Sequence, residues 1–429
     1  MNKQRIRLAT AGLVALSLVG AACGSDDDSS DSTDAPAGTE ASTDTDAPAG
    51  TEAPADSAAP ADSEAPGDSA APADSEAPAD GGECETVDEI SLQLQWFTQA
   101  QFAGYFAAQE LGYYEDMCLE LTIVEGGVEL PPQTQVANGD VDFAISWVPK
   151  ALASREAGAD IVNIAQIFQR SGTLQVSFVD KDITTPEDFA GKNIGNWGFG
   201  NEYEVFAALG EAGLDPATDV TLIGQQFDMV ALLDGSIDAA EAMTYNEYAQ
   251  LLETVNPDTD ELYTPEDFNV VNYEEVGVGM LQDAIWAGGS RLEDDPEFRD
   301  QAVRFVAASI QGWAYCRDNP EECADIVTAA GSTLGATHQL WMMNEISKLI
   351  WPAPDGIGFI DSAAWDRTVE ISLNTPNLEG ATVITAEPTD GAYTNSIVEA
   401  AWTLLEGMDL DLAGESFEPI EVTLTEDGE

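Results

Sequence analysis

Apolar and polar residues alternate with two different periods along the chain from residue 90 onward. Residues 90–96 change character at almost every position, as a strand with one buried face does. Residues 99–111 instead place large apolar side chains at helical spacing and end at Gly112. By the same criteria, further strands are predicted at residues 119–124, 141–147, 161–168, 174–179, 193–197, 220–224, 237–243 and 277–287. Further helices are predicted at residues 132–138, 202–212, 229–234 and 246–253.

This order of elements predicts an α/β fold with mainly parallel sheets covered by helices. Thr185-Pro186 marks a break, after which a second set of strands and helices begins. The C-terminal part has a helical pattern at residues 297–317, 321–330, 337–350, 363–373 and 396–406. We therefore expect two α/β lobes with a largely helical C-terminal part. A ligand in such a protein binds in the cleft, near the carboxyl ends of the strands.

The start of the chain has the organisation of an export signal. A basic beginning and a short apolar run at residues 8–20 lead through small residues to Cys23. Small residues before a cysteine resemble a bacterial lipobox, although Gly20 stands where that pattern prefers Leu. We expect residues 1–22 to be a lipoprotein signal peptide and Cys23 to be lipidated. An ordinary secretory signal that contains a cysteine is the alternative.

Residues 23–83 are predicted to be disordered. After Cys23 they consist of repeats rich in Asp, Glu, Ser, Ala and Pro, with no aromatic, no large aliphatic and no basic residue. Such a segment has nothing to bury that would offset the entropy lost on ordering, and its acids and prolines keep it extended. We expect an acidic tether between the lipid and the folded body. A disordered tail without a spacing role is the alternative.

The charge of the chain limits its partners. It carries 80 Asp and Glu against 14 Lys and Arg, a formal net charge of −66 at pH 7. Nucleic-acid backbones are bound through Lys and Arg, so we expect no nucleic acid as a partner. The overall field also disfavours a bare anion as the ligand, although a local group of cations can override it. The folded body contains no segment typical of a membrane span, so the lipid is the one membrane contact that we expect.

Four cysteines follow the tether, at Cys84, Cys118, Cys316 and Cys323. An even number in an exported protein predicts two disulfides. The last two flank a short polar segment between predicted helices, so their pairing is the simplest and leaves the first two for each other. Three pairings are possible in principle. We expect no metal site, because the body has no CxxC motif and the chain has one histidine.

Several short segments follow one another in a specific order. They are QWFTQAQFAGY at residues 95–105, AAQELGYY at 107–114, GG at 126–127, VANGDVDFAI at 136–145 and KNIG at 192–195. Together they resemble the NMT1/THI5-like branch of periplasmic solute-binding proteins, over roughly residues 88–400. The resemblance implies a two-lobed clamshell of the periplasmic-binding-protein kind (type II-like), with the second lobe inserted in the first. Its implied parts are lobe 1 at residues 88–178 and 279–410, lobe 2 at 179–278, and a C-terminal tail at 411–429.

The resemblance also implies a function. The protein is expected to be an extracytoplasmic, lipid-anchored and monomeric solute-binding protein of the cell membrane, which delivers a small molecule to the permease subunits of an ABC importer. Our first choice of ligand is a small planar heterocycle such as a thiamine-precursor pyrimidine, and a flavin-like heterocycle is second. Family members that bind such pyrimidines carry Asn and Glu in a segment like residues 244–248. Binders of nitrate- and sulfonate-type anions share the wider fold and are an alternative, with Arg155 and Arg170 the cations to examine.

The expected ligand-binding residues follow the ends of predicted strands. Trp96 offers a flat face for stacking, glutamines offer both donors and acceptors, and glycines let the backbone approach a ligand. We expect a planar ring to be sandwiched between Trp96 and Trp197. The full set is Trp96, Gln99, Gln101, Gly126, Gly127, Ser146, Trp147, Asn196, Trp197, Asn201, Tyr245, Asn246 and Glu247. Each of the aromatic residues has a second interpretation as part of the core.

An enzymatic function is the remaining alternative. One branch of the family synthesises a pyrimidine from a pyridoxal cofactor and histidine, and it carries a cysteine-rich, iron-associated motif that this chain lacks. His338, the only histidine, lies in a helical stretch beside Leu340 and Trp341, which favours a structural or surface position over a catalytic base. We expect a binding protein with no catalytic residue, no cofactor and no metal.

Overall fold

The computed structural model describes residues 84–198 and 200–429. The predicted signal peptide at residues 1–22, the lipidation of Cys23 and the predicted tether at residues 23–83 lie outside the described residues. Within the described part of the chain, none of the helices combines the length and the apolar character needed to cross a membrane.

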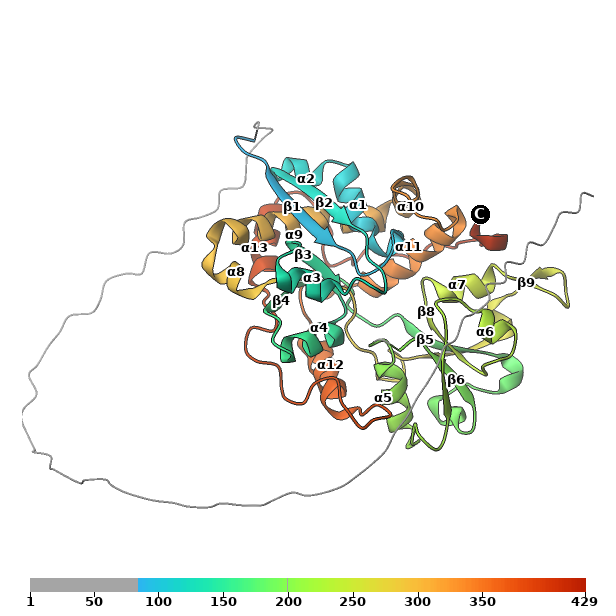
Figure 1. The fold of residues 1–429 in the computed structure, drawn as a ribbon. Helices are drawn as coiled ribbons and strands as arrows, with labels where there is room; N and C mark the ends of the chain where they lie inside the picture. Colours follow the sequence, from blue (N-terminus) through green and yellow to red (C-terminus); the bar gives the residue numbers. More distant parts are fainter. Residues whose placement is uncertain (1–83, 199) are drawn as a thin grey trace, which may run out of the picture. The chain divides into compact units, whose positions relative to one another are not determined.

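One mixed sheet of five strands forms the centre of the larger part of the fold (Figure 1). Its strands, in the order β2-β1-β3-β12-β4, are β2 (Leu119–Val124), β1 (Asp88–Gln93), β3 (Phe143–Ser146), β12 (Ala284–Gly288) and β4 (Ile161–Gln166). β1 is parallel to β2 and β3, as expected, but β12 is antiparallel to both of its neighbours. β12 is the strand on which the chain returns from the smaller sheets, and it enters this sheet in the opposite direction. The fold class is α/β as predicted, with fewer parallel pairs.

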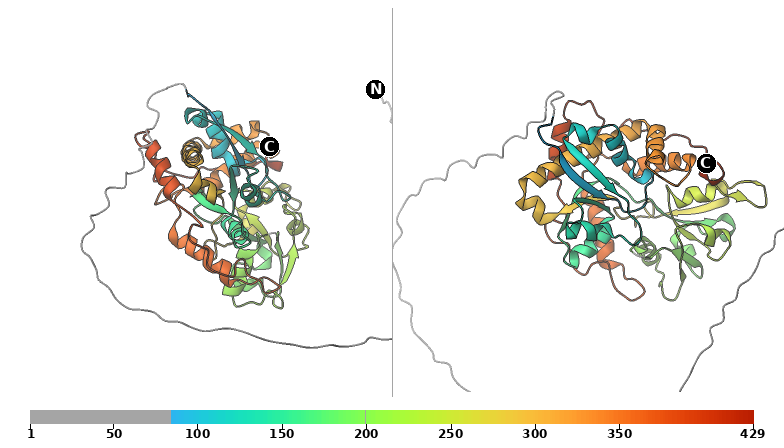
Figure 2. Two further views of the ribbon diagram at one scale, coloured as in Figure 1. Left: turned by 60° about the vertical axis from the view of Figure 1, so that its left-hand side comes forward. Right: turned by 45° about the horizontal axis from the view of Figure 1, so that its top comes forward.

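Helices cover both faces of this sheet, because successive residues of its strands point to opposite sides. Phe143 and Ile145 belong to one core cluster, whereas Ala144 between them belongs to another. The first face is covered by α1 (Ala103–Glu110), α9 (Pro296–Asp318), α11 (Ala336–Ile350) and α13 (Ser396–Leu405) (Figure 2). The second face is covered by α3 (Pro132–Asn138), α4 (Val148–Glu156) and α12 (Ser362–Asn374). The predicted C-terminal helices are therefore confirmed.

Two glycines let α1 and α9 cross at close range. A Cβ added to Gly312 would lie 2.0 Å from the carbonyl oxygen of Gly104, and one added to Gly104 would lie 2.2 Å from the ring of Trp313. Glycine is the residue that allows such an approach of two backbones. In the same contact, Tyr105 packs edge-on against Trp313 with ring centroids 5.6 Å apart. The crossing holds α1 in place behind the segment that connects it to β1.

The other sheets form a second part, which we call the small lobe (residues 173–272); the rest of the described body is the large lobe. An antiparallel sheet has the order β11-β5-β8, with β11 (Phe268–Asn272), β5 (Thr173–Phe178) and β8 (Ala240–Met243). A parallel pair joins β6 (Asn193–Asn196) and β7 (Thr221–Gly224), and β9 (Val255–Asn256) pairs with β10 (Glu261–Leu262). The helices are α5 (Tyr203–Glu211), α6 (Val230–Leu233) and α7 (Glu247–Leu252).

The position of β5 differs from the sequence prediction, which assigned residues up to 178 to the first lobe. β5 is hydrogen-bonded to β8 on one edge and to β11 on the other. Its residues Leu174 and Val176 are buried in a core cluster of the small lobe. The boundary between the two sheet systems therefore lies before β5, because this strand needs both small-lobe partners to complete its hydrogen bonds.

Short elements complete the body. They are α2 (Tyr113–Asp116), α8 (Gly289–Asp294), α10 (Pro320–Ala329), and the 3-10 helices η1 (Ala100–Phe102), η2 (Val179–Lys181), η3 (Pro186–Phe189), η4 (Pro265–Asp267) and η5 (Glu426–Gly428). The disulfides are Cys84–Cys118 and Cys316–Cys323, the simplest of the three pairings open to the sequence. The first ties the start of the described body to the residue before β2, and the second joins α9 to α10.

Residues 411–429, the predicted C-terminal tail, are packed against the body. The carbonyl oxygen of Ala413 accepts a hydrogen bond from the large lobe at 2.9 Å, and the backbone N–H of Ile420 donates to Asn344 on α11 at 2.9 Å. Further on, the backbone N–H of Asp427 donates to the carbonyl oxygen of Glu253, at the end of α7, at 3.3 Å. The segment therefore contacts both lobes.

Candidate ligand-binding site

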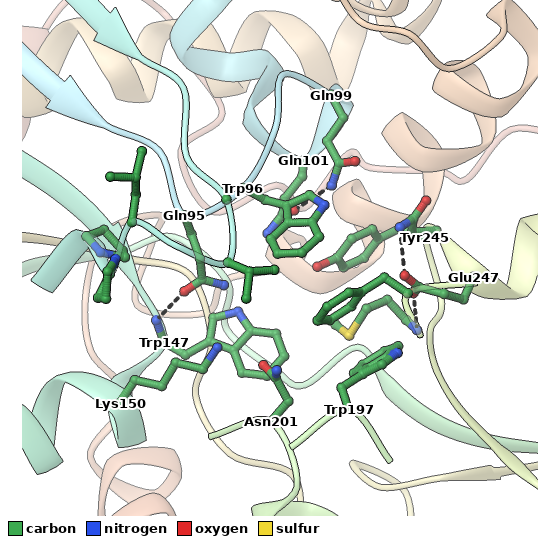
Figure 3. Close-up of a pocket in the computed structure, with 18 of the residues that line it drawn as sticks. Gln95, Trp96, Gln99, Gln101, Trp147, Lys150, Trp197, Asn201, Tyr245 and Glu247 are labelled. Carbon is green, nitrogen blue, oxygen red and sulfur yellow. Dashed lines mark hydrogen bonds between the residues drawn. The ribbon is translucent and has the colours of Figure 1, made fainter. Parts of the chain in front are cut away.

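A cavity of about 290 Å³ lies between the two lobes (Figure 3). The large lobe lines it with Gln95, Trp96, Gln99, Gln101, Gly127, Val128, Leu130, Pro131, Pro132, Gln133, Trp147 and Lys150. The small lobe lines it with Trp197, Asn201, Phe227, Met243, Tyr245, Asn246 and Glu247. Most of the predicted site residues are thus brought together at one cavity. The exceptions are Gly126, Ser146 and Asn196.

Those three residues belong to the framework behind the cavity. Ser146 is fully buried at the end of β3, and Asn196 is the last residue of the β6 ladder. In both strands it is the following residue, Trp147 or Trp197, that reaches the cavity. Gly126 allows two loops to touch, since a Cβ there would lie 2.2 Å from a backbone carbonyl oxygen. None of these three predicted residues lines the cavity, and in each case the next residue along the chain does.

The aromatic wall differs from the sandwich that the sequence predicts. Phe227 contacts both tryptophans: its ring centroid is 4.7 Å from that of Trp96 and 5.8 Å from that of Trp197, which it meets at an interplanar angle of 24°. The two tryptophans therefore do not face each other across an open slot. Three rings from both lobes form one apolar surface against which a planar ligand can stack.

A chain of hydrogen bonds gives the large-lobe side of the cavity a fixed polarity. Asp283, buried behind it, accepts from Gln101 Nε2 and from Trp147 Nε1, each at 2.8 Å. Gln101 Oε1 in turn accepts from Gln99 Nε2 at 2.8 Å. Gln99 Oε1 ends this chain and receives no hydrogen bond from any residue that the structure describes. Burial raises the pKa of Asp283 to about 7, and the hydrogen bonds from Gln101 and Trp147 oppose this rise.

Lys150 supplies a cationic group to the cavity. It lies in the first turn of α4, and its ammonium nitrogen is 4.8 Å from the ring centroid of Trp147. A Cβ added to Gly200 of the small lobe would lie 3.2 Å from Cγ of Lys150, so the lysine side chain reaches the opposite lobe. Burial lowers the pKa of Lys150 to about 8, whereas nearby acids raise it. The charge is therefore partly withdrawn from water and available to a ligand.

The two arginines singled out from the sequence lie elsewhere. Arg155 donates to the carbonyl oxygen of Ile161 and to the hydroxyl of Thr389. Arg170 donates to backbone carbonyl oxygens in the last turn of α11 and just after it, at 2.7 to 3.0 Å. Neither lines the cavity, whereas Lys150 does.

Buried acids organise the small-lobe side. Glu241 accepts a hydrogen bond from the backbone N–H of Trp197 at 2.7 Å, which fixes the loop after β6. Glu247 accepts from the backbone N–H of Met243 at 3.0 Å and from Asn246 Nδ2 at 2.8 Å. Burial is the main cause that raises the pKa of both carboxyl groups. Glu247 itself lines the cavity, where it can accept a hydrogen bond from a ligand.

Sequence reasoning missed several functional positions. Lys150 and Phe227 line the cavity, and Asp283 orients two of the predicted residues from behind it. Lys150 stands four residues after Ser146 in a chain with few cations, which was an available signal. Phe227 and Asp283 have no local pattern that distinguishes them from core or surface residues. Among residues 84–198 and 200–429 no cluster of His, Cys, Asp and Glu is arranged to hold a metal ion.

The chain is similar to several curated proteins, among them small-molecule binders and a synthase. The chain is 22% identical to a formylaminopyrimidine-binding protein of Halalkalibacterium halodurans, over 57% of this chain and 71% of that protein. It is 25% identical to the riboflavin-binding protein RibY of Chloroflexus aurantiacus, over 66% of this chain and 80% of that protein. A shorter match, 27% identical over 31% of this chain and 42% of the relative, is to a 4-amino-5-hydroxymethyl-2-methylpyrimidine phosphate synthase of Legionella pneumophila.

A solved structure gives the fold. The periplasmic aliphatic sulphonate-binding protein SsuA of Escherichia coli matches with a TM-score of 0.50 and 14% identity, over 79% of this chain and 94% of that protein. At this level of identity the likeness shows the fold alone, which is the periplasmic-binding-protein fold expected from the sequence. A family description, NMT1/THI5 like, matches residues 99–323, which is more than half of the chain. With its fold and its two-lobe cavity, the chain belongs to the NMT1/THI5-like family.

Proposed function

We propose that this protein is an extracytoplasmic solute-binding protein that captures a planar heterocycle for import. The observation that carries the proposal is the cavity between the lobes, which combines an aromatic wall with hydrogen-bond acceptors and a cation. Trp96, Phe227 and Trp197 offer stacking surface, Gln99 and Glu247 offer acceptors, and Lys150 offers a positive charge. A flat ring with polar edge groups matches all of these features.

The small-molecule class that we favour is a thiamine-precursor pyrimidine, with a flavin-like heterocycle second. An exocyclic amino group on such a ring would donate to Gln99 and Glu247. A carbonyl oxygen or an anionic substituent on the far side would accept from Lys150, which lies across the cavity from Glu247 in Figure 3. The ligands named for the two relatives with the longest matched segments, a formylaminopyrimidine and riboflavin, support a planar nitrogen heterocycle.

Delivery completes the proposed function. A ligand that contacts both lobes stabilises the arrangement in which they meet, which shifts the population toward that form. This form would dock on the permease subunits of an ABC importer, with the binding protein acting as a monomer held at the membrane by a lipid on Cys23. No catalytic residue is assigned.

A sulfonate- or nitrate-type anion is the second candidate, and Lys150 is the observation that favours it. Lys150 is the single ammonium group among the described residues that line the cavity, it lies near the acids Asp283, Glu202 and Glu241, and the chain has a net charge of −66. Anions of this kind are stabilised by several converging donors and cations. One lysine among acids therefore favours a polar heterocycle over a bare anion.

The enzymatic alternative has less support. The cysteines of the described body, Cys84, Cys118, Cys316 and Cys323, are paired in disulfides, so none of them is a free thiol for iron. We therefore propose binding without chemistry. Incubating the protein with a pyridoxal phosphate and monitoring pyrimidine release would detect a pyrimidine-synthesising activity.

Mass spectrometry of small molecules that copurify with the protein tests the proposal directly. We expect a pyrimidine or flavin to be released on denaturation, and calorimetric titration with that compound to give a dissociation constant of about 1 µM or lower. Taurine and nitrate serve as controls, because each carries an anionic group and no planar heterocycle. Tight binding of taurine or nitrate, with no heterocycle bound, would contradict the heterocycle proposal.

A further inference from the structure

His338 lies buried between the two lobes, next to the cavity. Its ring nitrogen Nδ1 is 2.9 and 3.0 Å from the two carboxylate oxygens of Glu253, and its Nε2 is 3.0 Å from Asn246 Oδ1. His338 belongs to α11 of the large lobe, whereas its partners flank α7 of the small lobe. The side chain is only 2% exposed. The only histidine of the chain therefore joins the lobes, which the sequence did not indicate.

Hydrogen-bond accounting fixes the protons on this ring. A carboxylate can only accept, so Nδ1 donates to Glu253. Asn246 Nδ2 donates to Glu247 Oε1 at 2.8 Å, which leaves Asn246 Oδ1, an acceptor, facing the histidine. With the amide in this orientation both ring nitrogens face acceptors, and both then carry a proton. A ring with two protons is an imidazolium, paired with the carboxylate of Glu253.

The opposite orientation of the amide demands a different protonation of Glu247. If Asn246 were turned over, its Oδ1 would face Glu247 Oε1, and two acceptors would meet unless Glu247 carried a proton. The other oxygen of Glu247 already accepts from the backbone N–H of Met243 at 3.0 Å. The proton on His338 thus favours an ionised Glu247, a strong acceptor for a ligand, over a protonated Glu247 whose proton is bound to Asn246.

Electrostatics act in the same direction as the hydrogen bonds. Burial raises the pKa of Glu247, and the nearby His338 lowers it. Glu247 and Glu253 are the charged side chains that flank His338 from the α7 segment. The C-terminal turn contacts His338 through the backbone of Gly428, where an added Cβ would lie 2.8 Å from the Cβ of His338. Without the imidazolium, Glu247 would hold a proton more readily.

We propose that His338 is a positioning residue that selects the ligand. Held as an imidazolium by Glu253, it orients the amide of Asn246 and keeps Glu247 an acceptor, so that the site prefers heterocycles with an amino group or ring N–H at this edge over those with a carbonyl oxygen. This selectivity rests on the proposed function. The state of the histidine does not depend on it.

A nuclear magnetic resonance measurement tests the protonation without any ligand. The chain contains one histidine, so protein labelled with ¹³C,¹⁵N-histidine gives a single set of ring signals. At pH 7 we expect both ring nitrogens of the wild-type protein to show imidazolium chemical shifts. Glu253→Gln should move the ring toward a neutral tautomer. Shifts of a neutral tautomer in the wild-type protein would overturn the inference.

Two pyrimidines that differ in one group test the selectivity. The probes are 4-amino-5-hydroxymethyl-2-methylpyrimidine and its 4-oxo counterpart, titrated by calorimetry into wild-type, His338→Gln and Lys348→Gln proteins. We expect about a tenfold or greater preference of the wild type for the amino compound, because a mismatched polar edge leaves buried groups unpaired. The preference should fall below about threefold in His338→Gln. It should persist in Lys348→Gln, which alters an exposed-side cation on the same helix.

The outcomes separate the two proposals. An unchanged preference in a folded His338→Gln protein, or a preference of the wild type for the oxo compound, overturns the role of His338. Failure of both pyrimidines to bind the wild type counts against the proposed ligand class. In that case, and equally if His338→Gln does not fold, the histidine signals of the wild-type protein still decide whether the ring is an imidazolium.

Discussion

Individual side chains determine where the cavity offers hydrogen-bond acceptors to a ligand. Two hydrogen-bond chains run through its walls, one from Asp283 through Gln101 to Gln99 and one from His338 through Asn246 to Glu247. Each chain begins at a buried ionisable side chain, and each ends on an oxygen at the cavity. Gln99 Oε1 has no partner among the described residues and the carboxylate of Glu247 can accept a further hydrogen bond, so a ligand with donors at both ends suits the cavity.

The ring of Trp96 is expected to contribute to ligand affinity. Trp96→Ala removes the large-lobe ring from the aromatic wall and should weaken binding of the native heterocycle by about 1–3 kcal/mol, the usual range for one stacked aromatic. Phe97→Ala is the matched control, because Phe97 is the adjacent aromatic, is 51% exposed and does not line the cavity. Calorimetry on both variants checks the prediction. Equal affinities of the two variants would show that Trp96 does not contact the ligand.

Lys150 predicts a pH dependence of binding. Burial lowers its pKa to about 8, so the ammonium form predominates at pH 7 and is mostly lost by pH 9. A ligand whose carbonyl oxygen or anionic group accepts from this ammonium should therefore bind about tenfold more weakly at pH 9 than at pH 7. Lys150→Met should bind weakly at both values and lose this dependence. Calorimetry across the pH range measures the effect, and a profile that persists in Lys150→Met would assign the titration to another group.

The residues of the site were only partly predictable. The tryptophans and glutamines could be identified because they follow strand ends, where α/β proteins bind ligands. His338 was interpreted as a structural or surface residue because its partners, Glu253 and Asn246, are more than 80 positions away in sequence. Phe227 and Asp283 were missed for the same reason. Contacts between lobes depend on tertiary arrangement, which no local pattern reports.

At the scale of elements, the periodic segments were predicted well. Strand β2 and helix α3 have the predicted bounds, and the long C-terminal helices agree within about two residues. The elements that the sequence did not predict are short or irregular. Helix α4 begins with Val-Pro-Lys after a buried strand and shows little amphipathic contrast, and β11 is a five-residue strand whose pairing with β5 is antiparallel. Such elements are stabilised by their neighbours more than by their own sequence.

The crossing of α1 and α9 gives a prediction about stability. Gly312→Ala places a methyl group 2.0 Å from the carbonyl oxygen of Gly104 and 2.9 Å from the side chain of Ala108, so the two helices must separate. We expect a loss of about 1–3 kcal/mol in the free energy of unfolding, as in other overpacked contacts. Gly210→Ala is the control, because Gly210 lies in α5 with nothing within 4 Å of an added Cβ. That variant should be neutral or more stable by about 1 kcal/mol. Chemical denaturation of both variants distinguishes packing from helix propensity, and equal stabilities would show that the crossing is loose.

For the molecule as a whole, the proposed function depends on the contacts that join the two lobes. The ligand, the contact between Phe227 and Trp96, and the pair of His338 with Glu253 all join the two lobes. Binding to one form and not another stabilises that form by about 2.7 kcal/mol at a ligand concentration one hundred times the dissociation constant. The polypeptide adds a further connection, because residues 411–429 run from the large lobe to α7.

Deletion of residues 419–429 tests this last connection. The deleted segment contributes the hydrogen bonds from Ile420 to Asn344 and from Asp427 to Glu253, and it packs Leu424 against a core cluster of the small lobe. Its loss should lower the free energy of unfolding by about 2 kcal/mol and the melting temperature by a few degrees. Because the small lobe loses a tie to α11, ligand affinity should also fall.

Calorimetry and thermal denaturation of the deletion variant are to be compared with Glu421→Gln, which changes an exposed charge in the same segment and keeps its contacts. If the deletion lowered stability but left affinity unchanged, the segment would support α11 without linking the lobes. If affinity fell together with stability, while Glu421→Gln behaved as the wild type, the segment would be part of the mechanism that brings the lobes together. The second result is the one that its contacts to both lobes predict.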